Sequence, residues 1–210
     1  MSVFSFHPVK HIATGEGGMV TTDDPRLAEN LRAFRSHGVE RPPDRCAVEP
    51  WFYEMVALGY NYRISDIACA LGIAQLRKIG HQLRRRAEIA AAYNSAFAGL
   101  EALRLPEVDS GVESAWHLYV VRVRPEALRV GRTEVFNALR AENIGVQVHY
   151  IPVHYHPYYR RTLGTGEGLC PVAENAYEQL VSLPIWPGMT DADVADVITA
   201  VGKVVEAYRA

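Results

Sequence analysis

Cysteine is scarce in this sequence, and the few cysteines present do not suggest pairing. Cys46, Cys69 and Cys170 are an odd number, lie far apart and form no CxxC pattern. This distribution argues against a disulfide framework and against a cysteine-based zinc site. It is typical of a protein kept in a reducing compartment, so we expect a cytoplasmic protein.

Long apolar runs and an excess of one charge are also missing. No stretch approaches the roughly 20 apolar residues that span a bilayer. The first residues lack the basic-then-apolar layout of a secretory signal. With 22 Lys and Arg against 24 Asp and Glu, the formal net charge is −2. No general basic field attracts nucleic acid or anionic lipid, and we expect neither nucleic acid nor a membrane as a partner.

The composition is that of a folded protein, with 49% hydrophobic and 22% charged residues in a chain of 210. Short strands are predicted at residues 3–6 and 19–22. Helices are predicted to begin after Asp24, an N-cap candidate followed by proline, and near Ser65. The segment 39–57, with three prolines, is expected to be irregular.

A composition shift occurs at the long Ala- and Arg-rich helix predicted for residues 82–97. Beyond it, strands are expected at 117–123 and 146–151, with a helix at 133–142 between them. The last helix is predicted to begin at Thr190, whose hydroxyl pairs with Asp193 in a capping box. We therefore expect two domains, residues 1–80 and 81–210.

Lys10 is the first candidate for chemistry. It follows a predicted strand end and precedes the glycines at 15, 17 and 18. A lysine that attacks an aldehyde must be partly neutral, which requires a water-poor, electropositive surrounding. The alternative is a solvated surface lysine next to a turn whose glycines take positive φ. Ser5 is likewise either an ordinary strand hydroxyl or a donor to a phosphate.

The histidines at 149, 154 and 156 raise the question of a metal. Their spacing is not that of a standard ligand set and no carboxylate near them in sequence completes one, so we predict no metal site. His149, Tyr150 and His154 fit either an aromatic loop lining a ligand pocket or an ordinary packed loop. The glycines within residues 164–168 lack the Gly-Lys-Ser/Thr ending of a P-loop and are predicted to form a flexible loop.

Three segments together resemble one protein family. SFHPVKHI (5–12), followed by GEGG (15–18), is similar to the cofactor-lysine segment of the DegT/DnrJ/EryC1/StrS aminotransferases. LGYNYRISDIACALG (58–72) and LPIWPGMTD (183–191) resemble the second and the C-terminal signatures of that family, in the same order. The resemblance covers essentially the whole chain.

The resemblance implies an α/β fold of the aspartate aminotransferase type (fold type I). Residues 1–80 would be the remainder of the large domain that binds pyridoxal 5'-phosphate (PLP), and residues 81–210 the small α+β C-terminal domain. Lys10 would form the Schiff base with PLP and later move a proton. Ser5 would bind the cofactor phosphate, and Asn61 the phosphate of the PLP in a neighbouring subunit.

The resemblance also implies the substrates. Arg63 is a candidate for the nucleotide diphosphate, because its planar fork of donors suits phosphate oxygens. The segments 5–12 and 148–154 are most similar to the pseudaminic acid subgroup, which transfers an amino group from L-glutamate to C4 of a UDP-linked 4-keto-6-deoxy sugar. The roles of Asn61 and Arg63 imply a homodimer with shared active sites.

The chain departs from the family in one respect. Family members carry a long stretch before the cofactor lysine, which contains the groups that cradle the phosphate, stack on the ring and pair with its nitrogen. Here nine residues precede Lys10. We therefore expect part of a longer enzyme, with little transaminase activity by itself.

Two alternatives remain open. One is a sibling that uses PLP for dehydration, although dehydratase relatives have a histidine where this chain has Lys10. The other is a non-catalytic remnant that dimerises or binds nucleotide without PLP turnover.

Overall fold

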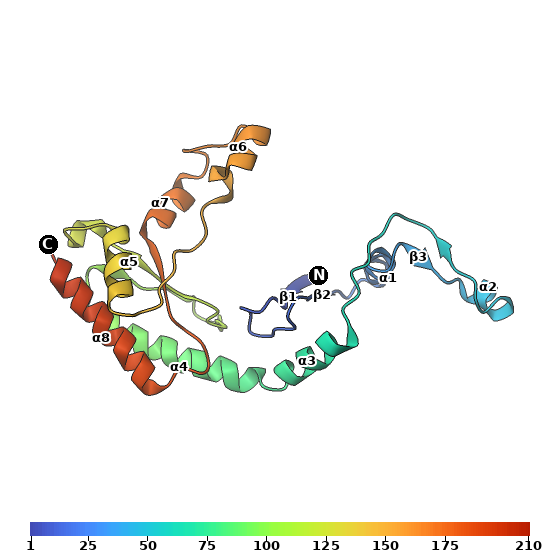
Figure 1. Cartoon of the computed structure of the whole chain (residues 1–210), viewed down its shortest axis with the longest axis horizontal. Helices are drawn as coiled ribbons and strands as arrows, with labels where there is room; N and C mark the ends of the chain where they lie inside the picture. Colours follow the sequence, from blue (N-terminus) through green and yellow to red (C-terminus); the bar gives the residue numbers. More distant parts are fainter. The chain divides into compact units, whose positions relative to one another are not determined.

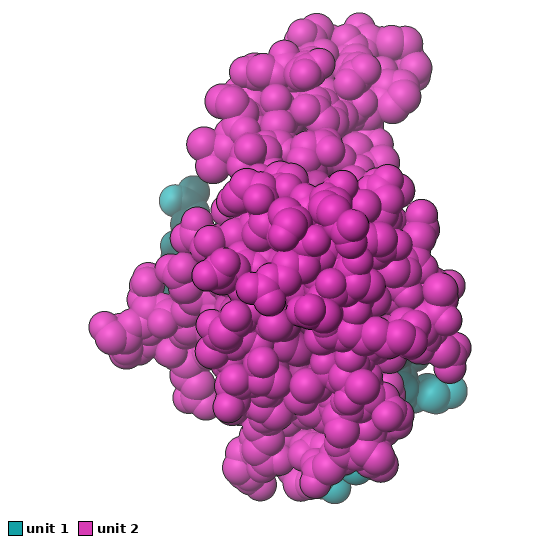
Figure 2. All heavy atoms as spheres, turned by 90° about the vertical axis from the view of Figure 1, so that its left-hand side faces the viewer, with its two compact units in different colours: residues 1–79 teal, residues 80–210 magenta.

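The computed structural model describes all residues from 1 to 210, and the chain forms two compact units. Unit 1 is Met1–Ile79 and unit 2 is Gly80–Ala210 (Figure 2). None of the helices combines the length and the apolar character needed to cross a membrane.

Unit 1 consists of short elements. In order they are β1 (Ser2–Ser5), β2 (Gly18–Thr21), α1 (Pro25–Phe34), β3 (Val39–Glu40), α2 (Pro43–Val48), β4 (Glu54–Met55) and α3 (Asp66–Leu76) (Figure 1). The strands form two antiparallel pairs, β1 with β2 and β3 with β4. The predicted helix starts are confirmed, because Asp24 accepts a hydrogen bond from the backbone N–H of Leu27 and Ser65 accepts one from Ala68. The segment 39–57 is not irregular, since it contains β3, α2 and β4.

Unit 1 has no apolar core of its own. All eight residues of β1 and β2 are exposed, and no residue of α3 is buried. Val3 is 73% exposed and Ile67 is 86% exposed. Helix α3 is apolar on every side, a pattern normally found in helices covered on all sides.

Unit 2 contains the larger elements. In order they are α4 (Ile79–Phe97), β5 (Leu103–Arg104), β6 (Tyr119–Val123), η1 (Pro125–Ala127), α5 (Arg132–Ala141), η2 (Val153–Tyr155), α6 (Pro157–Leu163), α7 (Pro171–Gln179), β7 (Leu180–Leu183) and α8 (Asp191–Tyr208). The sheet is antiparallel, in the order β5-β6-β7. Strand β6 pairs with β7 from Tyr119↔Leu183 to Arg122↔Leu180.

The core of the chain lies in unit 2. Strand β6 alternates as predicted, with Tyr119, Val121 and Val123 buried. The apolar faces of α4, α5 and α8 complete the core, and α5 packs on both α8 and β7. In α8 the buried residues Val194, Val197, Val201 and Val205 recur every three or four positions, so they form one apolar face that can cover a sheet.

The expected strand at 146–151 is wrong. Only Gln147 pairs, through an isolated bridge to Ser182, and the chain then leaves the sheet. The third strand is instead β7, which directly follows α7. Helix α6, which stands away from the sheet in Figure 1, was not predicted because its residues are all exposed and show no apolar face.

Candidate functional site

Lys10 lies on the long connection between β1 and β2. The connection closes on itself, because the backbone N–H of Phe6 donates to the carbonyl of Gly17 at 2.9 Å and that of Thr14 donates to the carbonyl of Phe6 at 3.0 Å. Within it, the backbone N–H of Lys10 donates to the carbonyl of His7 at 2.9 Å. Lys10 is half-buried on this turn. The turn fixes the backbone from which its amine extends.

This connection packs against α3 and against Ile64, just before that helix. The side chain of Thr14 is buried, and its hydroxyl donates to the carbonyl of Glu16 at 2.9 Å. A Cβ at Gly72 would lie 3.0 Å from the Thr14 methyl, and one at Gly17 would lie 3.1 Å from Ile64 Cδ1. The two glycines therefore permit a close approach. The lysine segment and the 58–72 segment, which are far apart in sequence, meet within unit 1.

Asn61 and Arg63 sit on a strip of chain held against the end of α1. The backbone N–H of Tyr60 donates to the carbonyl of Phe34 at 2.7 Å, and that of Tyr62 donates to the carbonyl of Arg35 at 2.9 Å. The rings of Tyr60 and Tyr62 stack with centroids 4.9 Å apart. Both Asn61 and Arg63 are exposed, so their backbone is fixed while their side chains remain accessible.

The predicted site residues divide between the two units. Unit 1 contains Ser5, Lys10, Asn61 and Arg63. Ser5 ends β1, and its hydroxyl accepts a long hydrogen bond of 3.4 Å from the backbone N–H of His7. Ser5 and Lys10 thus share one hairpin, next to the segment of Asn61 and Arg63. His149, Tyr150 and His154 belong to unit 2.

The histidine segment contains a carboxylate contact that sequence reasoning missed. His154 is buried, and its Nε2 lies 2.8 Å from Oε1 of Glu174. Glu174 is distant from His154 in the sequence, but α6 and the following loop return the chain so that α7 reaches His154. Tyr150, in contrast, is 85% exposed and its ring lies 5.6 Å from that of His149.

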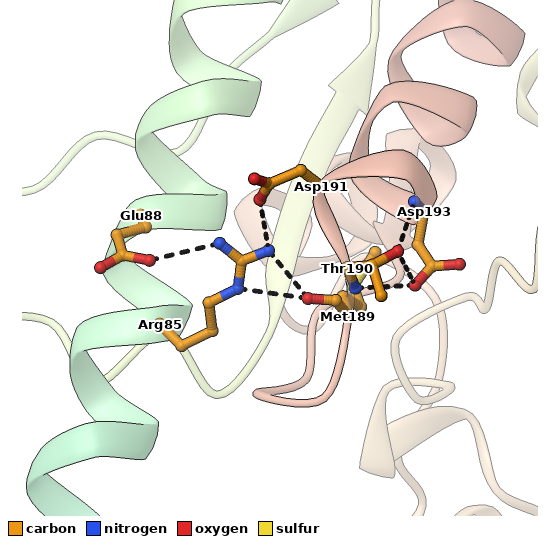
Figure 3. Close-up of polar contacts among 6 residues, drawn as sticks. All are labelled: Arg85, Glu88, Met189, Thr190, Asp191 and Asp193. Carbon is orange, nitrogen blue, oxygen red and sulfur yellow. Dashed lines mark hydrogen bonds and ion pairs between the residues drawn. The ribbon is translucent and has the colours of Figure 1, made fainter.

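The LPIWPGMTD segment joins β7 to α8 and is clamped by α4 (Figure 3). The guanidinium of Arg85 donates to the carbonyl of Met189 from Nε at 3.2 Å and from Nη2 at 2.8 Å. Nη2 also pairs with Asp191 at 2.8 Å, while Nη1 contacts Glu88 at 3.2 Å. In this unit the segment has an architectural role, fixing the start of α8 on α4.

The predicted capping box at the start of α8 is confirmed. The Thr190 hydroxyl accepts from the backbone N–H of Asp193 at 3.1 Å, and the Asp193 carboxylate accepts from the backbone N–H of Thr190 at 2.7 Å. The hydroxyl of Thr190 and then its backbone N–H lower the pKa of the Asp193 carboxyl. The box therefore depends on an ionised carboxylate.

Acid is expected to weaken this cap. When the pKa of a carboxyl is lower in the folded than in the unfolded state, the carboxylate stabilises the folded protein at pH values above the unfolded pKa. This stabilisation is lost as the pH falls through the folded pKa. In thermal unfolding at neutral pH, we expect Asp193→Asn to melt several degrees below the parent protein, and we expect the difference to narrow below about pH 4. Asp196→Asn, an exposed change one turn later, should show no such convergence. Parallel curves for parent and Asp193→Asn down to acid pH would contradict this role.

Arg86 forms a second clamp, next to the first on α4. Its side chain is buried, and Nη1 donates to the carbonyls of Trp116 and Ile185 at 2.9 Å each and of His117 at 3.3 Å. Burial lowers the pKa of its guanidinium. Trp116 adopts a φ of 46°, a costly conformation for a bulky residue. Arg86 thus ties the strained entry to β6 to the exit of β7.

Comparison with known proteins identifies the family. The profile described as the DegT/DnrJ/EryC1/StrS aminotransferase family matches residues 1–202. The chain belongs to this family. It is 46% identical over 208 residues to the uncharacterized protein MJ1066 of Methanocaldococcus jannaschii, covering 98% of this chain and 54% of that protein. It is 38% identical over 209 residues to a UDP-4-amino-4,6-dideoxy-N-acetyl-beta-L-altrosamine transaminase of Campylobacter jejuni, covering 100% of this chain and 53% of that protein.

Solved structures of DegT/DnrJ/EryC1/StrS members agree with the fold. PseC of Helicobacter pylori, an aminotransferase involved in pseudoaminic acid biosynthesis, matches with a TM-score of 0.88 and 29% identity over 99% of this chain and 53% of that chain. The PLP form of the sugar aminotransferase Spr1654 of Streptococcus pneumoniae matches with a TM-score of 0.84 and 29% identity over 98% of this chain and 51% of that chain. The predicted fold class, a fold type I PLP-dependent transferase, is confirmed. The chain spans about half the length of the relatives it matches.

Proposed function

We propose that this chain is part of a PLP-dependent sugar-nucleotide aminotransferase. The reaction is transfer of an amino group from L-glutamate to the C4 keto group of a UDP-linked 4-keto-6-deoxy-N-acetylhexosamine. One observation carries the proposal: the lysine segment and the 58–72 segment, which hold the cofactor and phosphate candidates, meet through Thr14, Gly17 and Gly72. The names of the C. jejuni and H. pylori relatives support the sugar class.

The hairpin of unit 1 suits PLP. A half-buried lysine stands on a closed turn, and a serine with its hydroxyl ends the adjacent strand. The glycines, which have no side chain, allow neighbouring backbone to approach closely. When bound, PLP supplies the electron sink for breaking bonds at the amino-bearing carbon. Lys10 would hold the cofactor covalently, and its amine, once displaced by the amino group of the substrate, would move the proton to and from that carbon. The Ser5 hydroxyl donates to the cofactor phosphate.

The remaining candidates bind the sugar nucleotide or a second subunit. In this proposal Arg63 binds the nucleotide diphosphate, and His149, Tyr150 and His154 belong to a segment that binds the sugar nucleotide. Asn61 reaches the cofactor phosphate of a second subunit in a homodimer. Unit 1 is then part of the large PLP-binding domain, and unit 2 is the small C-terminal domain.

The test is an assay of the purified chain with PLP, L-glutamate and the UDP-4-keto sugar. The UDP-4-amino sugar is measured by mass spectrometry, together with the 2-oxoglutarate released. We expect little of either product from this chain alone, but we expect a PLP absorbance band that is absent in Lys10→Ala. A dTDP-linked 4-keto sugar serves as the comparison for the nucleotide. UDP binding with no PLP absorbance band at saturating PLP would contradict the proposal and favour a nucleotide-binding remnant.

A further inference from the structure

Glu174 of α7 is the centre of a polar cluster in unit 2. Its Oε1 lies 2.8 Å from His154 Nε2 and accepts from the backbone N–H of Cys170 at 3.0 Å. Its Oε2 accepts from the backbone N–H of Gly168 at 2.9 Å. The side chains of His154 and Glu174 are 10% and 12% exposed, so the contact is largely shielded from water. Both oxygens of one carboxylate are thus used to join η2, the 164–170 loop and α7.

The cluster joins the two ends of the segment that contains α6, from His154 to Glu174. The hydroxyl of Thr165 donates to the carbonyl of His154 at 2.9 Å, adding a second link within this segment. Gly164 and Gly168 turn the loop with φ values of 65° and 84°. The loop is therefore held by a specific set of hydrogen bonds, centred on Glu174.

The same cluster anchors the segment of residues 148–153. At one end, Gln147 and Ser182 exchange backbone hydrogen bonds of 3.1 and 2.7 Å. At the other end, His154 is fixed by Glu174. Between these two anchors the chain has no strand or helix until Val153, where η2 begins, and it contains the exposed ring of Tyr150. Removing the far anchor would leave this segment attached to the sheet at one end only.

We propose that Glu174 is a positioning residue: through His154 it holds residues 148–153 in the conformation in which His149 and Tyr150 meet the sugar nucleotide. This inference rests on the proposed function. A segment that is already ordered loses little conformational entropy when the ligand binds. A segment that adopts the binding conformation only part of the time has its apparent affinity reduced by that fraction.

The test compares the chain with its Glu174→Gln and Glu178→Gln variants. The side chain introduced by Glu174→Gln has a similar shape, but one carboxylate oxygen becomes an amide NH2. This NH2 faces donors, either His154 and Cys170 on one side or Gly168 on the other. Glu178 is exposed one turn later on α7, so its replacement makes the same charge change outside the cluster. UDP is the probe, followed by NMR at the amides of residues 148–153. Hydrogen exchange is measured at the amides of Gly168 and Cys170 without ligand.

We expect UDP to shift the 148–153 amides of the parent chain and of Glu178→Gln equally, and to bind Glu174→Gln about tenfold more weakly. Exchange at Gly168 and Cys170 should accelerate in Glu174→Gln alone, with the far-UV circular dichroism unchanged. Equal UDP affinity in Glu174→Gln and the parent chain would overturn the positioning role while leaving the proposed function standing. If exchange accelerates but UDP shifts no 148–153 amide in the parent chain, the proposed site fails and Glu174 only closes the loop.

Discussion

Replacing Lys10 with alanine is expected to remove the pyridoxyl label that borohydride fixes to the chain in the presence of PLP. The parent chain should take up about one label, recovered in the peptide of residues 5–12, and Lys10→Ala should fall to background. The absorbance band of bound PLP should disappear in the same variant. The reason is positional, because Lys10 stands half-buried on the closed turn between β1 and β2, in the same hairpin as Ser5.

The chain makes this test unusually clean, because its other lysines are Lys78 and Lys203. Lys78 is exposed, and Lys203 is 64% exposed and paired with Glu142. Neither of them lies on the connection between β1 and β2, where the cofactor is proposed to bind. Lys78→Ala is therefore the matched control, and it should label as the parent does. A label recovered on Lys78 or Lys203 in the parent chain would remove the basis for assigning the cofactor to Lys10.

The elements of the fold that could be predicted are those whose signals are local. Asp24, Ser65 and Thr190 cap the helices that follow them, because an N-cap acts on a backbone N–H two or three residues away. Strand β6 and helix α8 each show the apolar period of their own conformation. In the candidate site, resemblance identified the segments of Lys10 and Asn61 without showing that they touch.

The features that could not be predicted depend on distant partners. Strand β7 is too short to be distinguished in sequence from the helix before it. It takes the place next to β6, with Ser182 paired to β6 on one side and to Gln147 on the other, and only Gln147 of the expected strand at 146–151 joins the sheet. Glu174 meets His154 across 20 residues, and Arg86 meets Ile185 across 99. No spacing rule connects such residues. In the sequence, Arg86 is the last member of an arginine triplet that is typical of a solvated face, yet its exposed fraction is 6%.

Loss of Arg86 is expected to destabilise unit 2 more than any other arginine change on α4. Arg86→Ala leaves the carbonyls of Trp116, His117 and Ile185 without their donor in a water-poor place, which we expect to cost about 3 kcal/mol of unfolding free energy. For a unit of this size the melting temperature should fall by about 10 °C. Hydrogen exchange should accelerate first near Trp116, whose left-handed backbone loses its support.

Three companion variants separate the possible reasons for such a loss. Arg84→Ala, on the exposed face of the same helix, should change the melting temperature little. Arg86→Lys keeps the charge, but the shorter lysine side chain places its nitrogen short of Nη1, which reaches all three carbonyls, so this variant should fall between Arg86→Ala and the parent. Arg86→Met keeps most of the volume without the charge. Desolvating a buried cation is costly. If Arg86→Met were as stable as the parent, the three hydrogen bonds would only offset that cost. The clamp would then serve to hold Trp116 in its strained conformation, not to stabilise the unit.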